Sequence, residues 1–194
     1  MERKDLTYFP DNENDFNGVL FVLREPHKIR LSETNEQTLI GNRKWFRKIA
    51  EIDAEEASDD KALLHRYKNR FNEMMVVCEK ARYRCFHELQ NTAYTNIKQT
   101  GGGKTASQEY WKISAEDKYN ILKQIIECVK PKVEVIFLPR ELFKIVLQKH
   151  PCYEPALKDG LIYRKQTAMK KVQIDGITYY EIFHPVHRRT IKIP

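Results

Sequence analysis

The stretch GVLFVLREPH, residues 18–27, decides how the rest of the chain is interpreted. Its centre, Val19–Leu23, is an unbroken apolar run that contains β-branched residues, a pattern typical of a strand buried on both faces of a parallel sheet. The run stops at Arg24-Glu25-Pro26-His27, because a proline cannot donate a hydrogen bond to a neighbouring strand. The sequence therefore predicts a buried strand that leads directly into charged and polar residues.

Further helices and strands are predicted to alternate along the chain. Ser114 is a strong helix N-cap, and the apolar residues that follow it keep helical spacing until Pro131 ends the pattern. The other predicted elements are a helix over 42–49, strands over 86–97, 133–138 and 160–163, a helix from Pro139 to Leu147, a loop over 151–160, and two strands within 172–183 joined by an Asp175-Gly176 turn. This alternation favours a three-layer α/β/α fold with a central, mainly parallel sheet.

Length and composition favour one globular domain over residues 1–194, with an irregular polar arm over 1–17. The chain has 194 residues, of which 41% are hydrophobic, so it can bury a full core and is not globally disordered. The formal net charge of +7 favours a polyanionic partner. The four cysteines form no C-x-x-C pair, so we expect no structural zinc. We also expect no other metal and no cofactor.

The location of the protein is predicted from the same composition. The first fifteen residues are polar and acidic, and the chain has no apolar run long enough to cross a membrane. The simplest interpretation is a cytoplasmic protein with reduced thiols and no membrane partner. The oligomeric state stays open.

Three polar clusters follow predicted strands, at residues 24–27, 95–96 and 184–187. In open α/β sheets, ligands bind beyond the carboxyl ends of the strands. The sequence therefore predicts that a carboxylate, an amide and imidazoles line one cleft.

These clusters resemble the motifs of the uracil-DNA glycosylase superfamily. Glu25-Pro26-His27 is similar to the family's first motif, in which a strand ends in Gly-x-Asp-Pro-Tyr-His or Gly-x-Asn-Pro. Residues 95–98, Thr-Asn-Ile-Lys, are similar to a Thr-Asn-Leu-x-Lys strand end, and His184-Pro185 to the His-Pro-Ser motif. Residues 41–46 are similar to the helix start that follows motif one. The motifs occur in the family's order over residues 18–188.

The resemblance implies a DNA glycosylase that hydrolyses the N-glycosidic bond of a damaged or deaminated base, with DNA rather than RNA as partner. It implies that Glu25 orients or activates the attacking water, that His184 donates to the base carbonyl, and that Asn96 hydrogen-bonds the base edge. The resemblance further implies contacts of Pro26, His27 and Pro185 with the substrate, and of Lys98, His187, Arg188 and Arg189 with the nucleic-acid backbone. Lys104, in the glycine loop over 101–105, is also expected to contact backbone phosphates.

Two other functions stay open. Leu23 stands where the family has glycine, Arg24 lies inside the first motif, and Val186 replaces the serine of the last motif. These departures favour a non-catalytic nucleic-acid-binding protein on the same fold. Alternatively, residues 101–105, Gly-Gly-Gly-Lys-Thr, resemble part of a phosphate-binding loop, which would make the protein a nucleotide-phosphate enzyme using Lys104.

Each predicted site residue also has a structural interpretation. Glu25 can simply end a strand, and Asn96 can be a turn residue that bonds its own backbone. His184 and His187 can be surface residues or a metal-binding pair.

Overall fold

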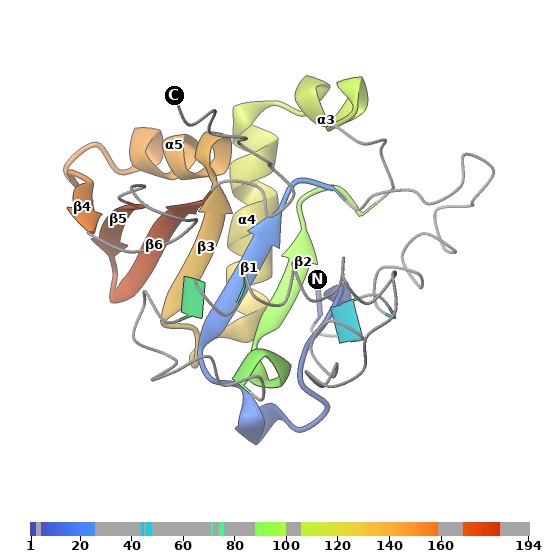
Figure 1. Cartoon of the computed structure of the whole chain (residues 1–194). Coiled ribbons are helices and arrows are strands. Elements are labelled where there is room, and N and C mark those ends of the chain that lie inside the picture. The colour runs from blue at the N-terminus through green and yellow to red at the C-terminus, as the bar shows by residue number, and fades with distance from the viewer. Residues whose placement is uncertain are drawn as a thin grey trace, which may run out of the picture.

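The computed structural model describes residues 1–2, 5–25, 44, 46–47, 71, 74–75, 88–99, 106–158 and 169–182. These residues include a six-stranded sheet with helices packed against it (Figure 1). The strands are β1 (Val19–Leu23), β2 (Ala93–Asn96), β3 (Val135–Pro139), β4 (Ala156–Lys158), β5 (Met169–Ile174) and β6 (Ile177–Ile182). The helices are α3 (Gln108–Lys112), α4 (Ala115–Val129) and α5 (Arg140–Lys149), with 3-10 turns η2 (Glu13–Asp15) and η3 (Glu88–Asn91).

The sheet is mixed, so the expectation of a mainly parallel sheet was wrong. Its strand order is β2-β1-β3-β6-β5-β4, and the pairings from β2 to β6 are parallel. β5 runs antiparallel to β6, and β4 runs antiparallel to β5. The reason is the predicted Asp175-Gly176 turn, whose residues have φ angles of 50° and 79°. A two-residue hairpin joins only antiparallel strands, whereas parallel strands need a long crossover. The α/β class itself is confirmed.

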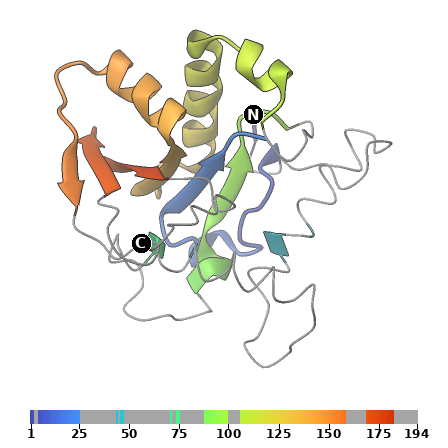
Figure 2. The same cartoon turned by 45° about the horizontal axis from the view of Figure 1, so that its top comes forward.

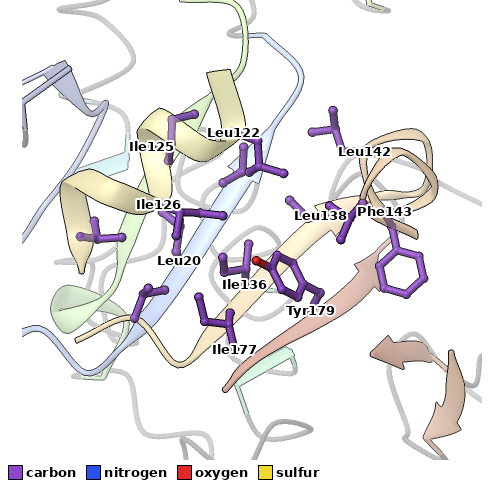
Figure 3. Close-up of a cluster of buried hydrophobic side chains, with 14 of the residues drawn as sticks. Leu20, Leu122, Ile125, Ile126, Ile136, Leu138, Leu142, Phe143, Ile177 and Tyr179 are labelled. Carbon is purple, nitrogen blue, oxygen red and sulfur yellow. The ribbon is translucent and has the colours of Figure 1, made fainter. Parts of the chain in front are cut away.

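Both faces of β1 are buried, as its apolar run predicted. Leu20 and Val22 pack into the core that α4 and α5 cover, which Figure 3 shows for Leu20. Val19, Phe21 and Leu23 face a second core. That second core also holds residues Phe46, Phe71, Met74 and Met75, which are helical. The sheet therefore has buried side chains from helical residues on each side.

Most of the other predicted elements are found, with altered lengths. α4 begins as expected, with the Ser114 hydroxyl accepting a 3.0 Å hydrogen bond from the amide of Asp117, and α5 begins directly after Pro139. Within the predicted strand over 86–97, the extended part is β2, and η3 precedes it.

Two elements contradict the sequence prediction or were missing from it. The predicted loop over 151–160 contains β4, so that prediction was wrong. Helix α3 was not predicted. The predicted strand over 160–163 lies outside the described residues. Of the predicted helix over 42–49, Lys44, Phe46 and Arg47 are described, and all three are helical.

The N-terminal arm is anchored rather than loose where it is described. Tyr8 and Tyr94 of β2 exchange backbone hydrogen bonds of 2.8 and 3.0 Å, which forms an antiparallel bridge. Leu6 and Phe16 are buried in the core under α4. Gly18 then turns the chain into β1 with a φ of +83°, and a Cβ there would lie 2.8 Å from the Lys132 carbonyl oxygen. Only glycine tolerates both conditions.

No helix in the described part of the chain combines the length and the apolar character that a membrane span requires.

Candidate functional site

The ends of β1 and β2 lie side by side at the carboxyl edge of the parallel strands. Leu23 is the register partner of Asn96. Pairing continues beyond the strands, because the amides of Ile97 and Lys98 donate 2.9 Å hydrogen bonds to the carbonyls of Leu23 and Arg24. Helix α3 lies beyond the same edge (Figures 1 and 2). The sequence predictions for Glu25, Asn96 and Lys98 therefore fall on one edge, as expected.

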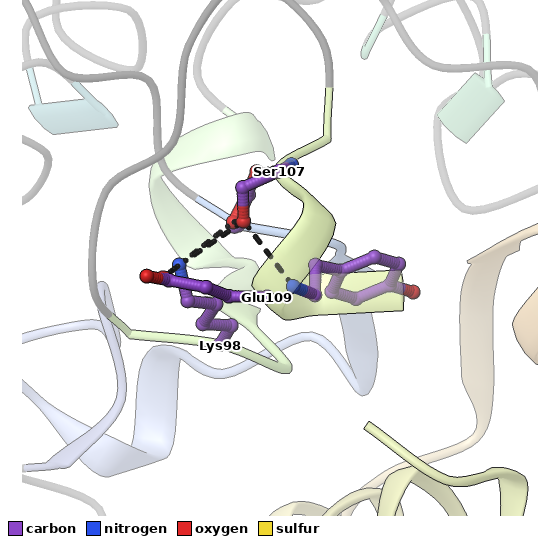
Figure 4. A network of polar contacts seen from close by, with 5 residues as sticks. Lys98, Ser107 and Glu109 are labelled. Atoms are coloured by element: carbon purple, nitrogen blue, oxygen red, sulfur yellow. Dashed lines mark hydrogen bonds and ion pairs between the residues drawn. The ribbon is translucent and has the colours of Figure 1, made fainter. Parts of the chain in front are cut away.

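The carboxylate of Glu25 is buried, with 4% of its side chain exposed. Its Oε1 accepts a short hydrogen bond from the amide of Ser107. Its Oε2 accepts from the Ser107 hydroxyl at 2.8 Å and from Lys98 Nζ at 3.1 Å. Lys98 also contacts the Glu109 carboxylate at 2.9 Å (Figure 4). The contacts fix the orientation of the Glu25 carboxylate.

These contacts also set the charge of Lys98. Burial by itself would lower the pKa of its ammonium, but the hydrogen bonds to Glu109 and Glu25 outweigh burial and raise it. Lys98 was predicted to contact the nucleic-acid backbone. In this structure two carboxylates neutralise its ammonium instead.

Ser107 links this carboxylate to helix α3. Its hydroxyl is the N-cap of α3 and accepts a 3.2 Å hydrogen bond from the Tyr110 amide. A serine at this position satisfies an amide that the helix leaves unpaired. The same hydroxyl donates to Glu25, so one side chain both starts the helix and holds it against the end of β1.

A second ion pair lies on the other face of the β1 end. The Arg24 guanidinium makes two hydrogen bonds to the Glu141 carboxylate in the first turn of α5, one of them 2.7 Å long. The Tyr110 hydroxyl donates to the same carboxylate at 3.1 Å. Burial, the largest single influence, would raise the pKa of Glu141, but the hydrogen bonds and charge of Arg24, together with backbone and Tyr110 hydrogen bonds, outweigh it, so this pKa is lowered. The hydrogen bonds that Arg24 donates to Glu141 raise the pKa of Arg24.

Aromatic rings of α3 surround a third cation, Lys118 of α4. Its ammonium lies 4.4 Å from the Tyr110 ring centroid and 5.5 Å from the Trp111 ring centroid. Burial lowers the pKa of this ammonium. The Arg24 guanidinium carbon lies 5.4 Å from the Trp111 centroid. Trp111 thus has two cations close to its ring.

Asn96 differs from all of these residues. It is 1% exposed, and both its side-chain nitrogen and oxygen are buried with no hydrogen-bond partner in the described structure. Its strand partner Leu23 packs in the second core, and register partners of parallel strands point to the same face. Leaving a buried polar group without a partner lowers the stability of the folded protein by about 1–3 kcal/mol. Such a group calls for an explanation, and a ligand is one.

The remaining predicted site residues lie outside the described part of the chain. They are Pro26, His27, Lys104, His184, Pro185, His187, Arg188 and Arg189. The residues that surround Glu25 and Arg24, namely Ser107, Tyr110 and Glu141, were not predicted. One signal could have found Glu141, because it opens the helix directly after the predicted strand ending at Pro139.

Within the described ranges, no three His, Cys, Asp or Glu side chains are arranged to hold a metal ion.

Comparison with known protein families, with curated proteins and with solved structures found no match. The functional proposal therefore depends on the residues of this chain.

Proposed function

We propose that the protein binds a nucleobase at the carboxyl edge of β1 and β2 and hydrolyses its N-glycosidic bond. The substrate is a damaged or deaminated base in nucleic acid, DNA rather than RNA. The observation that carries the proposal is the buried, unpartnered amide of Asn96. The uracil-DNA-glycosylase-like motif order, with Asn96 and Glu25 on neighbouring strand ends, supports it.

The chemistry of an amide suits a deaminated base. Deamination replaces an exocyclic amine by a carbonyl, which then lies next to a ring N–H. The Asn96 side chain offers both an N–H donor for the carbonyl and a C=O acceptor for the ring N–H. Because the amide is buried and has no protein partner, a base lacking this pattern would leave it unsatisfied. Sites of this kind discriminate strongly against the wrong partner.

Glu25 retains the capacity to act on water. A carboxylate has about four acceptor positions. Oε2 accepts two hydrogen bonds and Oε1 accepts one, so Oε1 keeps one position. In the proposed reaction this oxygen takes a proton from the water whose oxygen bonds to the sugar C1′. The bond from C1′ to the base breaks, and the base leaves with its electron pair and takes up a proton from solvent. The carboxylate charge also stabilises the cationic sugar transition state. Lys98 and Ser107 position it.

A second candidate function is nucleobase binding without hydrolysis. The burial of Glu25 and the engagement of both its oxygens favour it, because a catalytic carboxylate must contact water. In this case Asn96 still recognises the base, and the Glu25 contacts serve only to anchor α3.

Base release from oligonucleotides tests both candidates. The substrates are single- and double-stranded oligonucleotides that carry uracil, hypoxanthine, xanthine or a mismatch. The variants are Glu25→Gln and Asn96→Ala, with Glu109→Gln as the matched control. Glu109 also pairs with Lys98, but 78% of its side chain is exposed.

We expect Glu25→Gln to lower the rate of base release by about 10²–10⁴-fold, and Glu109→Gln to preserve it. Asn96→Ala is expected to abolish the preference for deaminated bases. Oligonucleotide binding that requires Asn96, with no base release by the wild-type protein, would establish the second candidate. If the wild-type protein neither binds nor cleaves any substrate, both candidates are wrong.

A further inference from the structure

Two adjacent aromatic residues of α3 differ sharply in burial. Tyr110 is fully buried, whereas Trp111 is 52% exposed. Trp111 is the most exposed aromatic side chain among the described residues. A tryptophan side chain presents a large apolar surface, and leaving half of it in water forgoes a substantial hydrophobic gain. An exposed indole at a candidate site therefore calls for a partner.

The indole is also held in a fixed position. Ser107 anchors the start of α3 to the Glu25 carboxylate. Tyr110 anchors its middle, because its ring is buried and its hydroxyl donates to Glu141. A five-residue helix has little stability of its own, so these contacts determine where Trp111 lies. A ring that is already positioned loses little conformational entropy when a ligand stacks on it.

The charges around the ring point to an anionic partner. Arg24 and Lys118 lie 5.4 and 5.5 Å from its centroid. Arg24 is neutralised by Glu141. Lys118 is buried, with 6% of the residue exposed, and the described structure has no carboxylate within ion-pairing distance of its ammonium beside the Tyr110 and Trp111 rings. An exposed aromatic ring with a buried, unpaired ammonium beside it combines an open stacking surface with positive potential, the two features by which proteins bind single-stranded nucleic acids.

The ring lies next to the candidate site. Arg24, which contacts Trp111, immediately precedes Glu25 in the chain, and the carbonyl of Arg24 accepts the hydrogen bond from Lys98. Two consecutive residues after β1 therefore connect the two places. Arg24 contacts the indole, and Glu25 carries the proposed catalytic carboxylate.

We propose that Trp111 is a stacking platform for a base that flanks the one held at Asn96. The occupant is a single-stranded segment of nucleic acid: one base stacks on the indole, and the backbone is attracted by Lys118. This inference rests on the proposed function and adds a second subsite to it, one that binds the strand whatever the base at Asn96.

Tryptophan fluorescence provides a test that does not depend on catalysis. The chain has two tryptophans, Trp45 and Trp111, so the Trp111 signal is the difference between wild type and Trp111→Phe. Titration with single-stranded oligothymidylate should quench this signal. Trp111→Ala should weaken oligonucleotide binding about tenfold or more, while Trp111→Phe, which keeps a ring, should bind within about threefold of wild type. Tyr153→Ala is the matched control, since Tyr153 is exposed by 37% and its ring makes an edge-to-face contact with His150, away from Trp111 in the sequence.

The outcomes separate this inference from the proposed function. Wild-type affinity and unchanged base release in Trp111→Ala would overturn the platform alone. Trp111-dependent binding without any base release would support the platform and remove the hydrolase. If thymidine monophosphate quenched the Trp111 fluorescence at the same concentration as the oligonucleotide, the assignment of a nucleic-acid strand as the occupant would be overturned. Absence of binding by the wild-type protein would overturn both proposals.

Discussion

The ends of β1 and β2 are neighbours in the sheet, but they differ in whether their polar side chains have hydrogen-bond partners. At the end of β1, both charged residues have several partners: Arg24 pairs with Glu141, and Glu25 with Ser107 and Lys98. At the end of β2, the Asn96 amide has none in the described structure. The paired groups fix the geometry of the edge. The unpaired group costs stability, and it is the group to which we assign base recognition, so the proposal places stability and recognition on two adjacent strand ends.

The largest expected effect breaks the paired end. Glu141→Ala leaves the Arg24 guanidinium and the Tyr110 hydroxyl without their acceptor. We expect the free energy of unfolding, measured by urea denaturation, to fall by about 2–3 kcal/mol. This loss is smaller than for a fully buried pair, because this pair is only partly buried.

Glu116→Ala is the matched control for this change. Glu116 occupies the same position in the first turn of α4 and pairs with Lys149 at the surface. Removing it should cost at most about 1 kcal/mol. Equal losses in the two variants would show that the Arg24 pair has no special role in holding the edge.

A smaller effect of the opposite sign is expected at the unpaired end. Asn96→Leu replaces the amide by an apolar group of similar shape, so it should raise the free energy of unfolding by about 1 kcal/mol and abolish base recognition. Thr92→Val is the control, because the buried Thr92 hydroxyl donates to the Leu89 carbonyl at 2.8 Å, and its loss should cost about 1 kcal/mol. Destabilisation by Asn96→Leu as large as that by Thr92→Val would mean that the amide is satisfied in the folded protein.

The smallest effect is a change with pH that only the paired end should show. The pKa of Glu141 in the folded protein is lowered from its ordinary value of 4.5. A lowered carboxyl pKa stabilises the fold above the ordinary value, and this stabilisation is lost as the pH falls through the folded pKa. The stability difference between wild type and Glu141→Gln should therefore shrink below about pH 4.5. The difference for Asn96→Leu should stay constant, since an amide does not titrate, and a parallel decline of both would contradict this assignment.

The elements that were predicted correctly are those with strong local signals. The apolar run of β1, the Ser114 cap of α4 and the Asp175-Gly176 hairpin each depend on residues close in the chain. The same hairpin makes the sheet mixed, because it adds an antiparallel strand to a chain whose other helices and strands alternate. β4 was missed because it has only three residues and its central side chain, Leu157, is exposed, so no burial pattern marks it.

The site was predictable only as far as strand ends could be located. Glu25 and Asn96 were placed on one edge because carboxyl ends of parallel strands meet there. Their environments were not predictable, because Ser107 is 82 residues from Glu25 and Glu141 is 117 residues from Arg24. Tertiary contacts of this kind leave no local pattern. Helix α3 was not predictable for the same reason, since its five residues are held by the tertiary contacts of Ser107 and Tyr110 and show no helical periodicity.

The bridge between Tyr8 and Tyr94 bears on whether the edge of the sheet can pair with another chain. β2 is the last strand on its side of the described sheet, and a bare outer strand offers unpaired amides and carbonyls to any other extended chain. The N-terminal arm exchanges backbone hydrogen bonds with Tyr94, so a segment of the same molecule covers part of this outer strand. Shortening the arm would therefore expose a nucleus for aggregation, although no residue of the candidate site would be altered.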